Sequence, residues 1–448
     1  MRLRTRLAPG SKSALGVLAL IVGALLALTP AEAGAPNGFA WDQFKGTTLR
    51  VLLHDNQWYG SLLESIPDFE KLTGIKVVTE ATGQVQLWNT LEVQLPQAGK
   101  VDVFATVPGL DGIRYHRMGW TRRINEYLEN PRLTAPDYRW DDFLPGLRKG
   151  MTVRGDILGP PVMGEHLALL YRKDIFQQQG RAVPRTLKEL EDAAQVMHGV
   201  AMTPKNGRGV GMVGRGQGAF ATSVYGALLH AMGASWLDAA GQPTMESPES
   251  LAALEMLHML LARHGPPDIS NFGWQEATGY FAAGQAAMYI EGGSVYPLLE
   301  TADSSQVKGR VGYALFPSGP GGTGTTIAAR GLAISRRSAH PEAAWLFCQW
   351  ATSVPQVQDA LVKGVLVPRT SVWQDRGIPN KVPSELAASF QEAGKIGHPT
   401  WAPPLVAVTA AREAVGSAIS ATLKGENIRV AAATAGKRLR EIISQTER

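Results

Sequence analysis

Hydrophobic and polar positions predict strands and helices in turn along the first part of the chain. Short apolar or β-branched runs predict three strands, at 48–53, 75–79 and 101–105. One helix is expected before Gly74, a residue type that suits a helix C-terminus, and another over 85–98. This order is typical of an α/β fold with a parallel sheet. Ligands of such sheets bind beyond the carboxyl ends of the strands, so the loops at 54–60 and 106–112 are candidate site loops.

Later segments carry the same kinds of pattern and predict a second lobe. Thr186 and Glu189 have the spacing of a capping box at a helix start. A strong amphipathic helix covers 248–264, with Ser247 as its N-cap. The glycine-rich stretch 317–325 is expected to be a flexible crossing or a loop over a cleft.

More than one crossing between the lobes would form a hinge, because lobes tied at several points rotate but do not separate. The segment 155–163, which has the pattern of a short hairpin with two prolines near its end, is the expected first crossing. The expected boundaries place 34–160 in the first lobe, 161–267 in the second, 268–318 in the first again and 319–448 in the second.

The first 33 residues have the pattern of a secretory signal peptide. A basic start precedes the apolar run 14–28, and Ala31-Glu32-Ala33 supplies a cleavage site after Ala33. The 15-residue run is shorter than the roughly 20 residues that span a bilayer, which disfavours a membrane anchor. No cysteine stands at the cleavage site to carry a lipid. The product is therefore expected free in the periplasm of a double-membraned bacterium.

Charge and composition indicate a secreted globular protein rather than a nucleic-acid binder. Residues 1–33 carry four basic residues and one acid, so their removal lowers the formal net charge from +5 to +2. The tightest basic run left, Lys437-Arg438-Leu439-Arg440, is typical of a solvated helix face. The single cysteine, Cys348, cannot form an internal disulfide and is expected in the core.

Motifs for catalysis, cofactors and metals are weak or missing in the sequence. The Gly-x-Gly-x-x-Gly match at 209–214 follows a turn-like segment instead of a strand, and no acid stands about 20 residues later. No His-x-x-x-His pair, cysteine cluster or Gly-x-Ser-x-Gly elbow occurs. We therefore expect no cofactor, no metal and no enzyme activity, although acids brought together by folding stay an open alternative.

Polar and aromatic residues after the first strand have the chemistry of a sugar site. Residues 54–59 (HDNQWY) combine hydrogen-bonding groups with two aromatic rings. Aromatic rings pack on the C–H faces of sugars, and carboxylates, amides and guanidiniums bond the hydroxyls. This loop is therefore the first candidate for ligand contact.

The order of several segments resembles the family 1 extracellular solute-binding proteins, the maltose-binding-protein-like receptors of bacterial carbohydrate ABC importers. The resemblance covers nearly the whole chain after the signal peptide. It rests on 69–77 (FEKLTGIKV), 101–104 (VDVF), 161–176 (PVMGEHLALLYRKDIF), 281–293 (FAAGQAAMYIEGG) and 341–350 (PEAAWLFCQW).

This resemblance implies a type II periplasmic-binding-protein fold, two α/β lobes on a multi-strand hinge with the ligand between them. It implies a monomer that delivers a sugar, oligosaccharide or polyol to membrane permease subunits. The ligand-binding residues it implies are Asp55, Gln57, Trp58, Gln84, Thr106, Glu165, His166, Arg215, Phe220, Tyr296, Arg330 and Trp401. Glu165 stands where the family has an acid that bonds sugar hydroxyls.

Two alternatives stay open at this level. A binding protein of the same fold could take a non-sugar such as glycerol phosphate, in which case Arg215 or Arg330 would meet the phosphate. A secreted glycosidase would need two carboxylates about 5–9.5 Å apart in one cleft.

Overall fold

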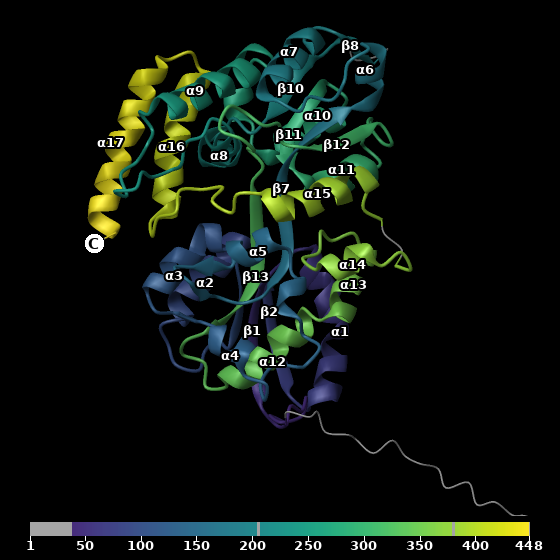
Figure 1. The fold of residues 1–448 in the computed structure, drawn as a ribbon, viewed down its shortest axis with the longest axis vertical. Helices are drawn as coiled ribbons and strands as arrows, with labels where there is room; N and C mark the ends of the chain where they lie inside the picture. The colour runs from purple at the N-terminus through teal and green to yellow at the C-terminus, as the bar shows by residue number, and fades with distance from the viewer. Residues whose placement is uncertain (1–37, 204–206, 379–380, 448) are drawn as a thin grey trace, which may run out of the picture.

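The computed structural model describes residues 38–203, 207–378 and 381–447, so the predicted signal peptide, 1–33, lies outside the described residues. Two α/β halves are stacked along the long axis of the molecule (Figure 1). Two long strands, β7 (Pro161–Arg172) and β13 (Ile327–Ser335), run between the halves and pair antiparallel with each other. The two halves are called the lower and the upper lobe below, as they stand in Figure 1.

The lower lobe is built on the parallel strands β1 (Thr48–His54), β2 (Lys76–Thr82) and β3 (Val103–Thr106). Residues from β13 continue this sheet antiparallel to β3. The three strands and the parallel pairing confirm the pattern expected at the start of the chain. The other elements of this lobe are α1 (Gln57–Thr73), α2 (Gln84–Gln94), η1 (Pro108–Gly112), α3 (Ile113–Arg117), β4 (Thr121–Arg122), α4 (Asn125–Glu129), η2 (Trp140–Asp142), α5 (Pro145–Gly150), β5 (Thr152–Val153), β6 (Asp156–Ile157), α12 (Pro341–Ala351), α13 (Val354–Val362) and α14 (Thr370–Gln374).

The upper lobe continues the sheet in the order β10, β11, β7, with β12 also on β7. The Gly-x-Gly-x-x-Gly segment forms the buried strand β10, and the predicted capping box at Thr186 and Glu189 is confirmed at the start of α7. The elements of this lobe are α6 (Lys173–Gln178), α7 (Leu187–Met197), β8 (Ala201–Thr203), β9 (Gly207–Arg208), β10 (Val210–Gly214), η3 (Gly218–Ala221), α8 (Thr222–Ala231), α9 (Pro248–Leu257), η4 (His258–Arg263), η5 (Ile269–Asn271), α10 (Trp274–Ala282), β11 (Ala286–Gly292), η6 (Gly293–Val295), α11 (Tyr296–Glu300), β12 (Val311–Leu315), α16 (Val408–Leu423) and α17 (Ile428–Thr446).

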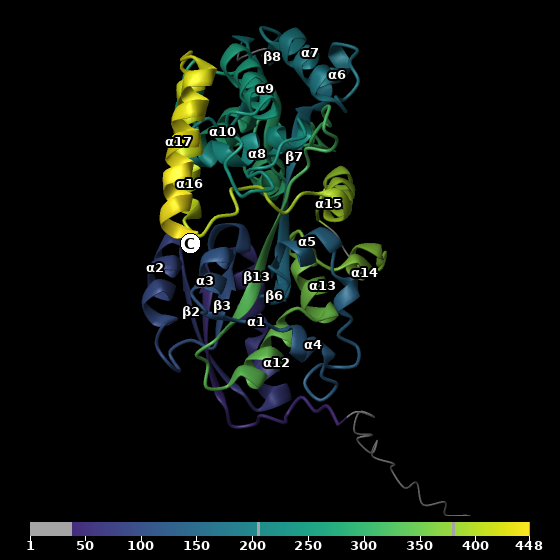
Figure 2. The same ribbon diagram turned by 60° about the vertical axis from the view of Figure 1, so that its left-hand side comes forward.

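Each crossing strand belongs to both lobes. The first half of β7 pairs with β13, and its second half pairs with β11 and β12 of the upper lobe. The register of β13 against β7 shifts between Arg330 and Gly331, where β13 turns to pair with β3. Irregularities of this kind re-aim side chains and are common beside functional sites. A third connection, 397–407, leads from α15 (Ser384–Ile396), which packs on α5 and β12 at the junction, to α16 (Figure 2).

The pairing of two segments differs from the expected lobe boundaries. Residues 268–318 were expected in the first lobe, but β11 and β12 pair with β10 and β7 of the upper lobe. Within 319–448, expected in the second lobe, α12 and α13 pack on α1 of the lower lobe. A lobe assignment depends on which strands pair, and the local pattern of one segment does not specify its partner.

The segment 54–60, expected to be a loop, is mostly the start of a helix. Asn56 caps α1 through its side-chain oxygen, which accepts a hydrogen bond from the Tyr59 backbone N–H at 3.1 Å. Helix α1 then begins at Gln57, and Trp58 and Tyr59 turn into the core. The polar residues that suggested a loop are thus a helix cap and a first turn.

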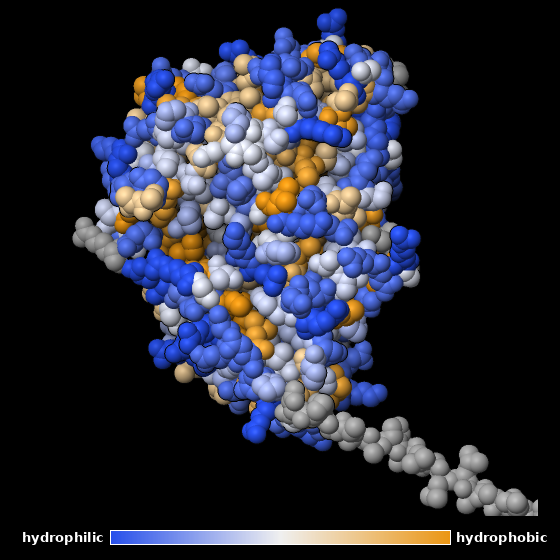
Figure 3. Space-filling model, in the orientation of Figure 1, coloured by the Kyte–Doolittle hydropathy of each residue, from blue (hydrophilic) through white to orange (hydrophobic). Residues whose placement is uncertain are grey.

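The glycine-rich stretch 317–325 is held by backbone hydrogen bonds to the end of α8 and to the segment before α7. Gly321 N–H donates to Ala231 O at 2.8 Å, and Ser318 N–H donates to Arg185 O at 2.9 Å. The surface seen in Figure 3 is mostly hydrophilic, with apolar residues in separate small groups. Across the described ranges, no helix has both the length and the apolar character that a membrane span requires. Cys348 is buried on α12, and burial raises the pKa of its thiol.

Candidate ligand-binding cleft

A cavity of about 660 Å³ lies between the two lobes. This volume is typical of small-molecule sites in proteins. Both lobes, both crossing strands and the 397–407 segment contribute to its walls. The polar, charged and aromatic residues that line it are His54, Gln84, Trp88, Glu165, Arg215, Phe220, Ser223, Trp274, Ser294, Thr326, Arg330, Trp401 and Arg412.

The two crossing strands place an acidic and a basic side chain at the middle of this cleft. Glu165 on β7 lies 3.6 Å from the Arg330 guanidinium on β13, and the Ser294 hydroxyl donates to Glu165 Oε1 at 2.5 Å. A Cβ on Gly292 would lie 2.2 Å from the same oxygen, so glycine is needed for this close approach. Burial opposes the charge on Glu165, but Arg330, Arg215 and Ser294 hold the pKa of the carboxyl below its ordinary value. Glu165 is therefore a carboxylate that can accept hydrogen bonds.

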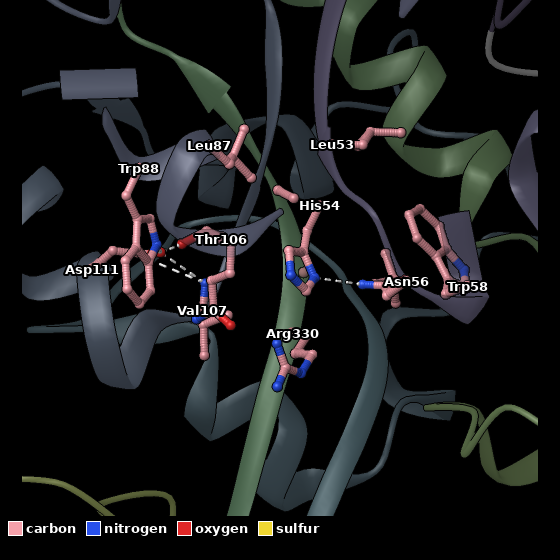
Figure 4. A pocket seen from close by; sticks show the side chains of 14 residues that line it. Leu53, His54, Asn56, Trp58, Leu87, Trp88, Thr106, Val107, Asp111 and Arg330 are labelled. Carbon is pink, nitrogen blue, oxygen red and sulfur yellow. Dashed lines mark hydrogen bonds between the residues drawn. The ribbon is translucent and has the colours of Figure 1, made fainter. Parts of the chain in front are cut away.

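The lower lobe presents a neutral histidine as a donor. The Asn56 side-chain oxygen caps α1, so its Nδ2 is the donor in the 3.0 Å contact with His54 Nδ1. The proton of the neutral ring is then on Nε2. Burial and the nearby Arg330 lower the pKa of His54, which favours this neutral form. Figure 4 shows the imidazole between Asn56 and Thr106, above Arg330.

A buried carboxyl group lies beside a small side pocket of about 20 Å³ that adjoins the cleft. Asp111 accepts hydrogen bonds from the Thr106 hydroxyl, from Val107 N–H at 3.1 Å and from Trp88 Nε1 at 3.1 Å (Figure 4). Burial raises the pKa of Asp111 to about 6 despite these donors. The interactions hold the indole of Trp88 at the edge of the cleft, where it is available for stacking.

The upper lobe contributes an arginine locked by a buried glutamate. Arg215 follows β10, and its Nε donates to Glu291 Oε2 at 2.7 Å while a second donor meets Oε1. The Tyr289 hydroxyl and Gly292 N–H also donate to Glu291, at 3.0 and 2.7 Å. The buried ion pair holds one edge of the Arg215 guanidinium and aims it along the cleft wall.

Trp401 joins the two lobes across the cleft. Its neighbour Thr400 is tied to the upper lobe, since its carbonyl accepts a hydrogen bond from Trp236 Nε1 at 2.8 Å. The indole of Trp401 reaches η1 of the lower lobe, where a Cβ on Gly109 would lie 2.6 Å from Trp401 Nε1. The ring therefore lies directly on the Gly109 backbone, and the two lobes touch at this point.

The structure brings most of the predicted site residues together. Six of them line the cleft: Gln84, Glu165, Arg215, Phe220, Arg330 and Trp401. Trp58 and Thr106 line the side pocket, although Trp58 is mainly a core residue packed at the start of α1. Phe220 is 46% exposed, an unusual degree for a phenylalanine side chain, and it forms an apolar part of the wall.

Four predicted residues lie outside both cavities: Asp55, Gln57, His166 and Tyr296. Asp55 is exposed between β1 and the α1 cap. Gln57 and Tyr296 donate hydrogen bonds to the carbonyls of Lys363 and Gly364, at 2.6 and 2.9 Å. His166 follows Glu165 on β7, and successive side chains of a strand point to opposite faces. It is buried behind the sheet, against Phe390.

Several cleft residues were not predicted as site residues. Trp274, Ser294 and Arg412 come from helix faces or turns that the local pattern does not mark. Trp88 lies near a predicted loop, and Asp111, which lines the side pocket, lies in the candidate loop 106–112, but neither was singled out as a site residue. His54 belonged to the candidate loop 54–59 but was not singled out. The only usable signal in the sequence was its place at the carboxyl end of a predicted strand, the same edge that carries Thr106.

His166 predicts a loss of stability in mild acid. Its Nε2–H donates to Ser389 Oγ at 3.0 Å, because that hydroxyl donates to Leu386 O, and its Nδ1 is buried with no partner in the described structure. Burial lowers its pKa to about 4 from an ordinary value near 6.5. The unfolded chain therefore takes up a proton first as pH falls, and His166 alone should lower the free energy of unfolding by about 3 kcal/mol between pH 6.5 and 4.

Urea unfolding of the wild type and of His166→Gln over this pH range measures the effect. The variant should lose less stability on acidification. Replacement of the exposed His340 by Asn should leave the pH dependence of the free energy of unfolding as it is in the wild type. Equal pH slopes for His166→Gln and the wild type would contradict the assignment.

Comparison with known proteins gives the family of the chain. The bacterial extracellular solute-binding protein family matches residues 56–358. The mannitol-binding protein of Pseudomonas aeruginosa is 29% identical over 308 residues, which cover 66% of this chain and 64% of that protein. The erythritol/L-threitol-binding protein of Mycolicibacterium smegmatis is 25% identical over 346 residues, 73% of this chain and 71% of that protein. The match thus spans a little under two thirds of the length of the mannitol-binding relative.

Solved structures agree with the fold. An ABC transporter solute-binding protein from Agrobacterium radiobacter, solved with ribitol, superposes with a TM-score of 0.73 at 23% identity, over 90% of this chain and 99% of that chain. One from Agrobacterium vitis, solved with D-mannitol, gives a TM-score of 0.71 at 24% identity, over 89% of this chain and 99% of that chain.

Fold and cleft together define a two-lobed binding protein of the type II periplasmic class, which confirms the predicted fold. The chain belongs to the bacterial extracellular solute-binding protein family, as the sequence resemblance indicated.

Proposed function

We propose that this protein is the receptor of a bacterial ABC importer and captures a polyol or sugar in the cleft between its lobes. The observation that carries the proposal is Glu165, a carboxylate at the middle of the cleft with donors and aromatic rings around it. Its oxygens can accept hydroxyl hydrogen bonds, while His54 and Arg330 can donate to hydroxyl oxygens. Relatives named for mannitol and for erythritol support the same ligand class.

Capture occurs by rotation of the lobes about the crossing strands. A ligand that touches both walls gains its full set of contacts only when the lobes are closed, so it shifts the population toward the closed form. The walls carry Trp88 below and Trp274 above, on separate lobes. A ring on each side supports the sandwiching of a small polyhydroxy ligand.

The electrostatics of the cleft favour binding over catalysis. A glycosidase needs one carboxylic acid with a raised pKa, together with a second carboxylate across the substrate. Glu165 has a lowered pKa. Burial raises the pKa of Asp111 to about 6, but its oxygens lie beside the side pocket and are occupied by the Thr106, Val107 and Trp88 donors. Neither is arranged as a proton donor to a ligand in the main cleft. The described residues contain no group of three or more His, Cys, Asp or Glu side chains placed to hold a metal ion.

We infer that the protein is secreted to the periplasm and acts there as a monomer that docks on permease subunits in the inner membrane. The signal-peptide pattern of residues 1–33 supports the export. A shift of the mature N-terminus to residue 34, found by mass spectrometry of the periplasmic fraction, tests the processing step.

A thermal-shift panel of mannitol, ribitol, erythritol, glucose, maltose and glycerol phosphate tests the ligand class. A ligand at 100 times its Kd should stabilise the protein by about 2.7 kcal/mol. Glu165→Gln should weaken the active polyol or sugar by roughly 10- to 100-fold, because it removes charge-assisted hydrogen bonds. Glu413→Gln, on the exposed face of α16, is the matched control. Absence of a shift with every polyol and sugar would reject the proposed ligand class.

A further inference from the structure

Three arginines of the described ranges line the cleft, and two of them already have an acid as partner. Arg215 is paired with Glu291, and Arg330 lies 3.6 Å from Glu165. Both guanidiniums are therefore compensated before a ligand arrives. Neither arginine needs an anion from the ligand, although both were predicted from the sequence as residues that would contact a phosphate group.

Arg412, on the first turns of α16, is the third arginine and has no such compensation. Its guanidinium donates to the Ala219 carbonyl at 2.8 Å and lies over the Trp401 ring, 5.5 Å from the centroid. Among the residues that the structure describes, no carboxylate forms an ion pair with it. Burial and the neighbouring Arg215 lower the pKa of Arg412 to about 10. A half-buried cation next to another cation is costly unless an anion joins them.

We propose that Arg412 binds a carboxylate group of the ligand, which makes the ligand a polyhydroxy monocarboxylate, a sugar acid. This inference rests on the proposed function, since the hydroxyl groups of the acid would meet Glu165, His54 and Arg330 as those of a neutral polyol would. The Ala219 and Trp401 contacts hold the guanidinium at the cleft wall. Its planar fork matches a carboxylate.

A single charge is favoured over a phosphate dianion. One uncompensated guanidinium neutralises one negative charge, and Glu165 at the centre of the cleft repels a second. The neighbouring cation, Arg215, is held by Glu291 on two of its donors. A carboxylate therefore fits the charge of this wall better than a phosphate group.

Matched ligand pairs test the proposal by titration calorimetry: sorbitol against gluconate, and mannitol against mannonate, with mannitol 1-phosphate added. At least one acid should bind the wild type about 10- to 100-fold tighter than its neutral partner, the usual range for a charged hydrogen bond. Arg412→Gln should remove that advantage, and Arg412→Lys should keep part of it. Added salt should weaken the acid and leave the neutral polyol unchanged.

Separate control measurements test whether the Arg412 variants are folded and whether the effect on binding is specific to Arg412. The unfolding midpoint without ligand checks that both Arg412 variants are folded, and Arg429→Gln, on the exposed start of α17, should leave both ligands unchanged. Neutral polyols binding as tightly as the acids in the wild type would overturn the inference but leave the proposed function standing. Tighter binding of the phosphate than of either acid would overturn the choice of a carboxylate. Failure of polyols, sugars and acids alike would reject the proposed function itself.

Discussion

Replacing Glu291 by Gln lowers the free energy of unfolding by about 3–5 kcal/mol, the usual cost of leaving one partner of a buried ion pair without the other. Glu291 has no exposed side-chain area, and each of its oxygens takes one Arg215 donor and one further donor. Glutamine has the same shape, but its amide NH₂ replaces one of the two oxygens and meets one Arg215 donor and one further donor instead of accepting from them. The midpoint of urea unfolding measures the loss.

An exposed ion pair supplies the matched control for this prediction. Glu441 pairs with Arg438 on α17 at 3.0 Å, with side chains 44% and 55% exposed. Exposed pairs contribute about 0–1 kcal/mol, so Glu441→Gln should shift the midpoint only slightly. A loss in Glu291→Gln no larger than in Glu441→Gln would show that the Arg215 pair does not support the upper lobe.

Local sequence patterns predicted where the helices and strands of this fold lie better than they predicted which strands pair with one another. The strands β1, β2 and β3 and the capping box of α7 follow from short-range periodicity and were placed within a few residues. The assignment of 268–318 depends on pairing with β7 and β10, contacts that no local pattern encodes. The start of α1 was missed because a helix cap and a polar loop use the same residue types.

For the candidate site, too, some residues could be predicted from the sequence and others depended on long-range packing. The position of Glu165 in the cleft could be anticipated from the family resemblance, whereas the neighbouring His166 was expected there and lies behind the sheet. Strand alternation forbids both from lining one wall. Arg412 and Ser294 reach the cleft only through long-range packing, from α16 and from the turn after β11. Their roles therefore could not be predicted before the lobes were assembled.

Replacing Gly109 by Val should hold the lobes apart and weaken ligand binding without touching the ligand. A Cβ at this position would lie 2.6 to 3.3 Å from three atoms of the Trp401 indole, closer than a side chain can pack. The ring must either turn into the cleft or move away with the upper lobe. Overpacking of this kind costs about 1–3 kcal/mol, so the affinity for mannitol or gluconate should fall roughly 5- to 150-fold. Small-angle scattering should report a more extended protein in the presence of ligand.

A double-mutant cycle separates the closure contact from a general effect of the substitution. Trp401→Ala removes the clash, so Gly109→Val should cost much less affinity in that background than in the wild type. Gly60→Val, where a Cβ meets no atom within 4 Å, controls for the added side chain. Equal losses from Gly109→Val in both backgrounds would mean that the valine acts without Trp401. A smaller loss of affinity in the Trp401→Ala background would instead mean that the lobes close on the ligand by packing the Trp401 indole against the Gly109 backbone. The absence of a side chain at position 109 would then be one of the factors that set the affinity.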